Sequence, residues 1–165
     1  MSGLTLWLWG GGISAQAAES IIFEYKILRE TLSIEELREF ADKGKPSSSL
    51  RTYFNLANLN PDTLQAVLSQ EIPVNPVSLS RLLNTSPGEL LLDQISQVIH
   101  TPSGRASRES LRSALVTSAL EDEAITLIEI LENYPTDEVR VDGDRLVGIY
   151  RRLNSVLSLL AILER

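Results

Sequence analysis

Three stretches in the first two-thirds of the chain each pair a helix-capping residue with a proline. These pairs are Asn60-Pro61, Asn75-Pro76 and Ser86-Pro87. The asparagine or serine side chain accepts a backbone N–H of the first turn, and proline fits the first helical position because no N–H is needed there. Since these starts follow one another closely, each helix must be short, and the fold must contain several of them.

The remaining pattern predicts a mostly α fold with a little extended structure. Capping boxes at Ser33 and Thr126 start two more helices, because a glutamate three residues later can bond back to the cap. Residues 20–25 and 28–32 indicate a small β-hairpin near the N-terminus, and residues 139–141 form an extended segment that could pair with it. We therefore expect a compact multi-helix bundle of about seven short helices with this hairpin attached.

The last predicted helix begins after an N-cap at Asp142 and becomes very apolar towards its end. Beyond Asn154 it is apolar on several sides, and such a helix must be buried against something. Its contact can be the chain's own core, a second domain, a protein partner or a membrane surface; its length and flanking arginines favour a core or domain contact. One stripe of the helix is the predicted partner contact: Leu153, Val156, Leu157, Leu160 and Leu163.

The N-terminal residues have features of an export signal. An apolar run leads to Ala15-Gln16-Ala17, an A-x-A cleavage pattern that would leave Ala18 as the mature N-terminus. No Lys or Arg precedes Lys26, so the segment is either a truncated signal or an apolar tail. We expect export to a periplasm, a thylakoid lumen or the exterior. The predicted divisions are a signal peptide at 1–17, a helical domain at 18–154 and an apolar contact segment at 155–165.

Composition excludes several classes of function. The net charge of −7 and the 5% aromatic content disfavour binding to nucleic acid, which requires cationic and stacking side chains. The chain has no cysteine, and Glu121-Asp122-Glu123 and Asp142-Gly143-Asp144 lack the ligand spacing of a calcium loop. No glycine-rich phosphate loop is present. We therefore expect no metal and no cofactor.

His100, the only histidine, is the first candidate for a functional side chain. General acid–base catalysis needs it to act with a nucleophile or a second base. Ser103 is near in sequence, but the G-x-S-x-G elbow of serine hydrolases occurs nowhere in the chain. We favour a structural role in which the charged ring meets the negative end of a helix.

Arg105 and Arg108 are the other candidate binding residues. They flank the start of a predicted helix and could bind a carboxylate or phosphate of a ligand or partner. The alternative, which the acidic surroundings favour, is a pair of structural ion pairs with Glu109 or other surface acids.

Four segments form a distinctive combination: Ser33–Leu37, Leu79–Leu83, Gln97–Arg105 and Glu132–Thr136. Together they resemble a helical domain of unknown function in exported cyanobacterial proteins. In those proteins the domain usually lies between a signal peptide and an alpha/beta-hydrolase catalytic domain. The resemblance covers residues 18–154 and implies an exported setting, with the catalytic residues in the hydrolase domain and none in this one.

The leading hypothesis is a non-catalytic, exported helical interaction module. It would bind or cover a protein partner, either a hydrolase or a membrane-associated assembly, and contact with a membrane surface stays open. One alternative is an accessory or N-terminal part of an alpha/beta-hydrolase. A second is a carrier of a small apolar ligand, with Arg105 or Arg108 pairing with an acid group.

Overall fold

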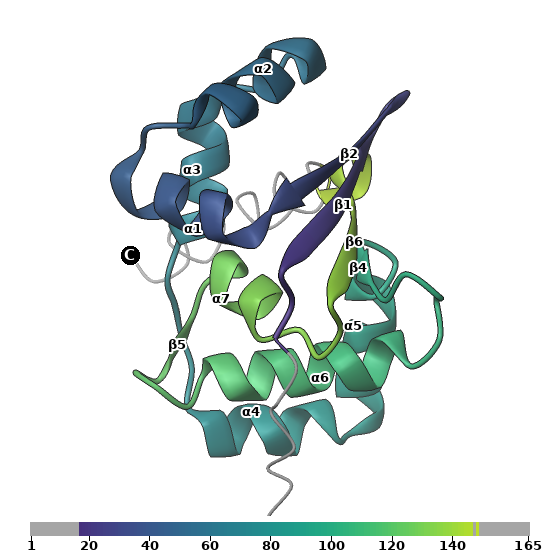
Figure 1. The fold of residues 1–165 in the computed structure, drawn as a ribbon. Coiled ribbons are helices and arrows are strands. Elements are labelled where there is room, and N and C mark those ends of the chain that lie inside the picture. The colour runs from purple at the N-terminus through teal and green to yellow at the C-terminus, as the bar shows by residue number, and fades with distance from the viewer. Residues whose placement is uncertain (1–16, 147, 149–165) are drawn as a thin grey trace, which may run out of the picture.

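A computed structural model describes residues 17–146 and 148 (Figure 1). The strands are β1 (Ser20–Tyr25), β2 (Leu28–Ser33), β3 (Ile72–Pro73), β4 (Ile99–His100), β5 (Ala124–Ile125) and β6 (Glu138–Asp142). The helices are α1 (Ile34–Lys43), α2 (Ser48–Ala57), α3 (Pro61–Ser69), α4 (Pro76–Leu83), α5 (Ser86–Ile95), α6 (Ser107–Ser118) and α7 (Leu127–Glu132). Residues 143–146 are also helical.

A mixed sheet organises the described part of the chain, so the expectation of a mostly α, compact multi-helix bundle is wrong. Four strands lie in the order β2-β1-β6-β4, with β1 parallel to β6 and the other neighbours antiparallel. A separate two-stranded sheet joins β3 to β5. The molecule therefore has alpha/beta character.

The predicted hairpin is confirmed, and so is its pairing with the later extended segment. β1 and β2 pair from Ser20 opposite Ser33 to Tyr25 opposite Leu28. β6 then adds to the other edge of β1, with Ile21 opposite Val139. Three two-residue strands were not predicted: β3, β4 and β5. In the four-stranded sheet the missed strand is β4, because Ile99 continues an apolar helical period that the structure ends at Ile95.

Side-chain caps set the helix starts much as predicted. Asn60 accepts the N–H of Thr63 at 3.0 Å, and Asn75 accepts the N–H of Ser78 at 3.1 Å. The third start is displaced by one residue, because Thr85 rather than Ser86 is the cap of α5. The capping box at Thr126 is complete: the Thr126 side chain accepts the backbone N–H of Glu129, and the Glu129 side chain accepts the backbone N–H of Thr126.

The helices form two groups around the sheet (Figure 1). α1, α3 and α7 contact one another and lie with α2 towards one end, whereas α4, α5 and α6 contact one another at the other end. The two groups meet where α7 packs against α6. Gly88 at the start of α5 is required there, since a Cβ on it would come within 2.0 Å of the Leu82 carbonyl oxygen. The α4–α5 contact is therefore a direct approach of backbone to backbone.

Two predicted features fall outside the described residues. They are the signal segment, apart from Ala17, and the contact stripe that begins at Leu153. Among the helices that the structure describes, none is both long and apolar enough to cross a bilayer.

Candidate functional site

A narrow hollow, here named the apolar groove, lies between strands β1, β2 and β6 and helices α1, α2, α3 and α7. Its volume is about 40 Å³, and among the described residues that line it Glu30 is the only charged one. The lining residues are Ile21, Phe23, Tyr25, Leu28, Glu30, Leu32, Leu37, Tyr53, Phe54, Leu56, Ala57, Leu59, Leu64, Leu68, Leu127, Leu131, Val141 and Leu146.

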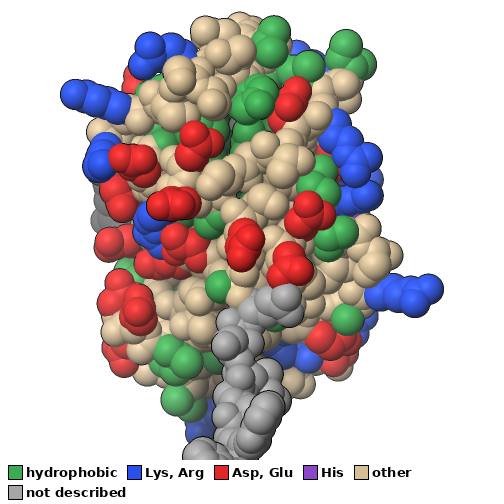
Figure 2. Space-filling view, viewed as in Figure 1, with side chains coloured by type: hydrophobic (Ala, Val, Ile, Leu, Met, Phe, Trp, Pro, Cys, Tyr) green, Lys and Arg blue, Asp and Glu red, His purple; other side chains and the backbone are tan. Residues whose placement is uncertain are grey.

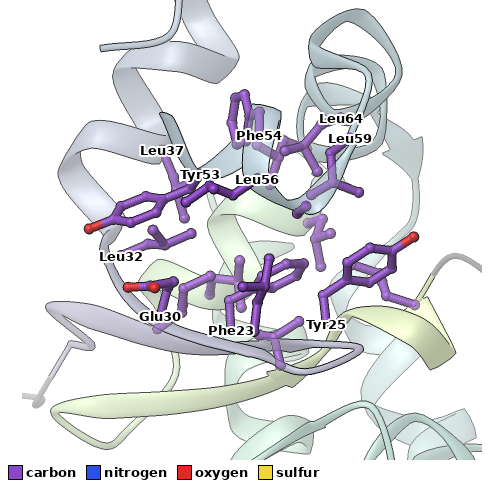
Figure 3. A pocket seen from close by; sticks show the side chains of 18 residues that line it. Phe23, Tyr25, Glu30, Leu32, Leu37, Tyr53, Phe54, Leu56, Leu59 and Leu64 are labelled. Carbon is purple, nitrogen blue, oxygen red and sulfur yellow. The ribbon is translucent and has the colours of Figure 1, made fainter. Parts of the chain in front are cut away.

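Two layers of side chains face each other across the groove (Figure 3). Phe23 and Tyr25 project from β1 and stack with their ring centroids 6.3 Å apart. Phe54 of α2 lies in the opposite layer and packs against Phe40 of the core, with centroids 5.3 Å apart. These aromatic contacts hold both sides of the groove in place.

Few polar side-chain groups line the groove. The hydroxyls of Tyr25 and Tyr53 point away from its middle, and the Glu30 carboxylate lies at one end (Figure 3). Apolar groups that enter the middle would lose contact with water without leaving a polar partner unpaired. Such burial stabilises a complex by roughly 25 cal/mol per Å² of apolar surface.

The rim of the groove carries exposed apolar side chains. Leu56 of α2 lines the groove and is 62% exposed; Ile27, at the tip of the adjoining β1–β2 hairpin and not a lining residue, is 97% exposed. In Figure 2, apolar side chains gather near the upper edge, where Figure 1 places α2, while acidic side chains are spread over the rest of the face. Exposed apolar surface beside a hollow is typical of an interaction site.

Specific polar contacts fix the helices that frame the groove. Arg38 of α1 donates two hydrogen bonds to the Glu132 carboxylate of α7, one of them from Nε to Oε1 at 2.7 Å. This hydrogen bonding raises the pKa of Arg38 above its ordinary value. Gln65 Nε2 of α3 donates to the Ala41 carbonyl oxygen at 3.0 Å. The groove is therefore framed by helices that are tied to one another.

The helical residues after β6 bring one more leucine to the groove. The Asp142 carboxylate accepts the N–H of Arg145 at 3.0 Å, which confirms the predicted N-cap. A Cβ on Gly143 would come within 2.5 Å of the Phe23 ring, so a glycine allows this turn to pack on β1. Leu146 follows, half-buried, as a lining residue of the groove.

His100 and Arg108, two of the predicted binding residues, lie at a different place, here named the polar depression. This shallow, open hollow contains parts of α5, β4 and α6 and shares no residue with the apolar groove. Its lining residues are Asp93, Ser96, Gln97, His100, Gly104, Ala106, Ser107, Arg108 and Glu109. Arg105 is exposed and is not part of this lining.

The chain between β4 and α6 is held by a small polar network. The buried Thr101 hydroxyl donates to the Arg105 carbonyl oxygen at 2.7 Å, and the Thr101 N–H donates to the Ser107 hydroxyl at 3.3 Å. His100 belongs to a strand rather than to the end of a helix, and its Nδ1 lies 3.0 Å from the Thr101 carbonyl oxygen. The network accounts for the conformation of this turn.

Arg108 has acidic partners within the described part of the chain. Its Nε donates to Asp93 Oδ1 at 2.7 Å and its Nη2 donates to Asp93 Oδ2 at 3.0 Å. These hydrogen bonds raise the pKa of Arg108, and Glu89 lies 3.9 Å from its Nη1. The guanidinium therefore already holds a carboxylate in the position that a ligand's acid group would take.

Sequence reasoning missed the apolar groove as a site. Its lining residues occur from position 21 to position 146, and each one by itself resembles an ordinary core residue. Two signals were available in the sequence: the predicted pairing of residues 139–141 with the N-terminal hairpin, and the surplus of large apolar residues around Tyr53 and Leu56. Within residues 17–146 and 148, no group of three His, Cys, Asp or Glu side chains is placed to hold a metal ion.

Comparison with known proteins gives a family and nothing beyond it. No curated protein and no solved structure matches the chain. Residues 17–142 match the family described as "Alpha/beta hydrolase of unknown function (DUF1400)". The matched range begins beside the A-x-A pattern and extends through β6, so it includes the whole sheet and nearly all of the groove. The chain therefore belongs to this alpha/beta hydrolase family of unknown function.

Proposed function

We propose that this chain is a non-catalytic interaction domain that binds an apolar helix of a protein partner in the apolar groove. The partner that we propose is an alpha/beta-hydrolase catalytic domain. The observation that carries the proposal is a hollow framed by tied helices, with an exposed apolar rim and a single charged residue among the described residues that line it. Grooves of this kind bind the apolar face of an amphipathic helix.

The chemistry of the groove supports binding rather than turnover. Among the described residues that line it, the polar side chains are Tyr25, Tyr53 and Glu30, and none of these is a serine, cysteine or histidine. Acyl transfer by a hydrolase requires a nucleophile and a base within hydrogen-bonding reach of each other. The family name thus fits a domain that accompanies the hydrolase chemistry of a second domain or chain.

The volume of the groove disfavours a bulky bound ligand. Its volume of about 40 Å³ is small beside the roughly 300–1,000 Å³ of pockets for drug-sized molecules. A carrier that pairs an acid group with Arg105 or Arg108 would need those arginines at the groove, but neither is among its lining residues. The geometry therefore favours the interaction domain.

We also propose that the domain works outside the cytoplasm, in a periplasm, a thylakoid lumen or the exterior. The A-x-A pattern places the cleavage point directly before Ala18, and the family match begins at residue 17. Ala18 is buried and donates its N–H to the Glu132 carbonyl oxygen at 3.2 Å. The intact mass of the protein recovered from culture fractions tests this: loss of residues 1–17 supports export, and full-length protein in the cytosolic fraction contradicts it.

The binding test uses two leucines of matched exposure. Leu56 lies on the rim and Leu120 lies outside the groove, at 62% and 65% exposure. The chain and its Leu56→Asp and Leu120→Asp variants are titrated by calorimetry against the catalytic domain of a family member that contains one. Leu56→Asp should weaken binding by about tenfold or more and Leu120→Asp by less than about twofold. Equal losses, or no binding of the unsubstituted chain, would contradict the proposal.

A parallel assay tests the non-catalytic part of the proposal. The purified chain is incubated with short-chain nitrophenyl esters, and the rate of hydrolysis is compared with that of buffer. The proposal expects equal rates. Hydrolysis above the buffer rate that disappears in a His100→Ala variant would instead identify the polar depression as an active site.

A further inference from the structure

We propose that Glu30 determines which helix the apolar groove binds: a helix whose apolar face carries a lysine or arginine at the Glu30 end. The inference rests on the proposed function of the groove as a helix-binding site. It adds the chemistry of the partner. For a given helix, a cation at one end of the apolar face also fixes the direction in which the helix lies in the groove.

Glu30 reaches the groove from the edge of the sheet. β2 is an edge strand in the order β2-β1-β6-β4, and Glu30 lies directly opposite Phe23 of β1. Residues that are opposite on neighbouring strands project from the same face of a sheet. The Glu30 side chain therefore lies beside the aromatic side chains of β1, where it is half-buried.

The Glu30 carboxylate differs from nearby acidic groups in what it contacts. Glu132 accepts hydrogen bonds from Arg38. Glu24 projects from the face of β1 away from the groove, and its Oε1 lies 3.5 Å from Nε of Arg29. Within residues 17–146 and 148, no hydrogen bond or ion pair engages the Glu30 carboxylate. It is therefore available to a cation that a partner brings.

A second oxygen atom lies towards the same end of the groove. Figure 3 shows the Tyr53 hydroxyl of α2 and the Glu30 carboxylate of β2 towards one end, with the Tyr25 hydroxyl towards the other. The Tyr53 hydroxyl has no hydrogen-bond partner among the described residues. Ammonium and guanidinium groups have several N–H donors and no acceptor. Such a group suits an end of the groove that offers acceptor oxygens.

Desolvation explains why the partner needs this cation. A helix that docks in the groove removes water from the half-buried carboxylate. A carboxylate that loses water without gaining a donor weakens the complex, whereas a cation replaces the lost water with a charge-assisted hydrogen bond. A helix with a neutral or acidic residue at this place is thus disfavoured. Glu30 therefore gives specificity by penalising the wrong partners as well as by binding the right one.

The sign of the effect of one substitution tests this role. Glu30→Gln keeps the shape of the side chain and removes its charge. Calorimetric titration against the same hydrolase domain should show about tenfold weaker binding. Glu24→Gln removes the same charge from the other face of the same hairpin, and it should change the affinity by less than about twofold. Circular dichroism checks that both variants are folded.

Three results would overturn the inference. Tighter binding of the Glu30→Gln variant would mean that the partner buries the carboxylate without supplying a cation. Unchanged affinity would mean that the carboxylate lies outside the contact. Equal losses for Glu30→Gln and Glu24→Gln would mean that only the net charge of the chain matters.

Helical peptides separate this inference from the proposed partner. The peptides share one leucine stripe and differ at one end of it, where they carry lysine, glutamine or glutamate. The lysine peptide should bind the chain about tenfold more tightly than the glutamine peptide, and Glu30→Gln should abolish the preference. Equal binding of all the peptides would contradict the role of Glu30.

The two assays together assign each failure. A lysine preference in a chain that does not bind the hydrolase domain would support the role of Glu30 and remove the proposed partner. Binding of the hydrolase domain that Glu30→Gln leaves unchanged would remove the role of Glu30 alone. No binding of any peptide or of the hydrolase domain would remove both.

Discussion

The apolar groove and the polar depression differ in what their side chains already contact. In the polar depression, Arg108 holds Asp93 through two hydrogen bonds, and the adjacent turn is held by Thr101. In the apolar groove, the exposed Leu56 and the half-buried Phe23 and Tyr25 border a space that no described residue fills. The reactive residue types are thus engaged in contacts within the fold at one place, while apolar residues at the other border a space that the described residues leave unfilled.

This contrast shows why residue type alone is a weak guide to function in this chain. A charged or titratable side chain is available to a ligand only if the fold leaves it without a partner. An apolar side chain becomes available when the fold leaves its surface partly in water. The following predictions test whether the polar depression is structural and whether the groove is the working surface.

The largest effect is expected at Tyr134, beneath the turn of the polar depression. Its ring is fully buried and its hydroxyl donates to the Ser107 carbonyl oxygen at 3.4 Å, while burial raises its pKa. Tyr134→Ala should lower the free energy of unfolding by about 3–5 kcal/mol through the cavity that it leaves. Tyr134→Phe, which keeps the ring, should cost roughly 1 kcal/mol. Urea unfolding measures both, and equal losses would show that the hydroxyl dominates.

A smaller effect is expected at the ion pair that ties α1 to α7 beside the groove. Arg38 and Glu132 are each about one-third exposed, so the pair is only partly screened by water. A double-mutant cycle with Arg38→Ala and Glu132→Ala should give a coupling free energy of roughly 1 kcal/mol. A coupling near zero would mean that packing alone fixes these helices.

The backbone at the start of α6 offers a stabilising change. Ala106 is the N-cap of α6 and makes no side-chain cap hydrogen bond. Its φ of +52° lies in the left-handed region, which is higher in free energy for alanine than for glycine. Ala106→Gly should raise the free energy of unfolding by about 0.5–1 kcal/mol. A destabilised variant in thermal unfolding would contradict the left-handed conformation at this residue.

The smallest effect is expected from the candidate polar residues on partner binding. His100→Ala and Arg105→Ala should each leave the affinity for the hydrolase domain within about twofold of the unsubstituted chain. The reason is that neither side chain borders the groove. A loss comparable to that of Leu56→Asp would move the binding surface to the polar depression.

Local patterns in the sequence were enough to predict much of the secondary structure. The caps at Asn60, Asn75 and Thr126 and the extended residues 139–141 depend on neighbouring residues, and they were identified correctly. The sheet order was not predicted, because a two-residue strand such as β4 has no recognisable period of its own. The groove was missed because strands and helices that are distant in sequence form it together. No short motif in the sequence indicates that these elements lie next to one another.

The measurement that tests the central claim most directly is site-specific photo-crosslinking to the hydrolase domain. The photoreactive residue benzoylphenylalanine is placed at position 56, on the rim of the groove, or at position 100, in the polar depression. Position 120 serves as an exposed control. The account predicts a cross-linked product from position 56 and none from positions 100 or 120. Cross-linking from position 100 without any from position 56 would contradict it.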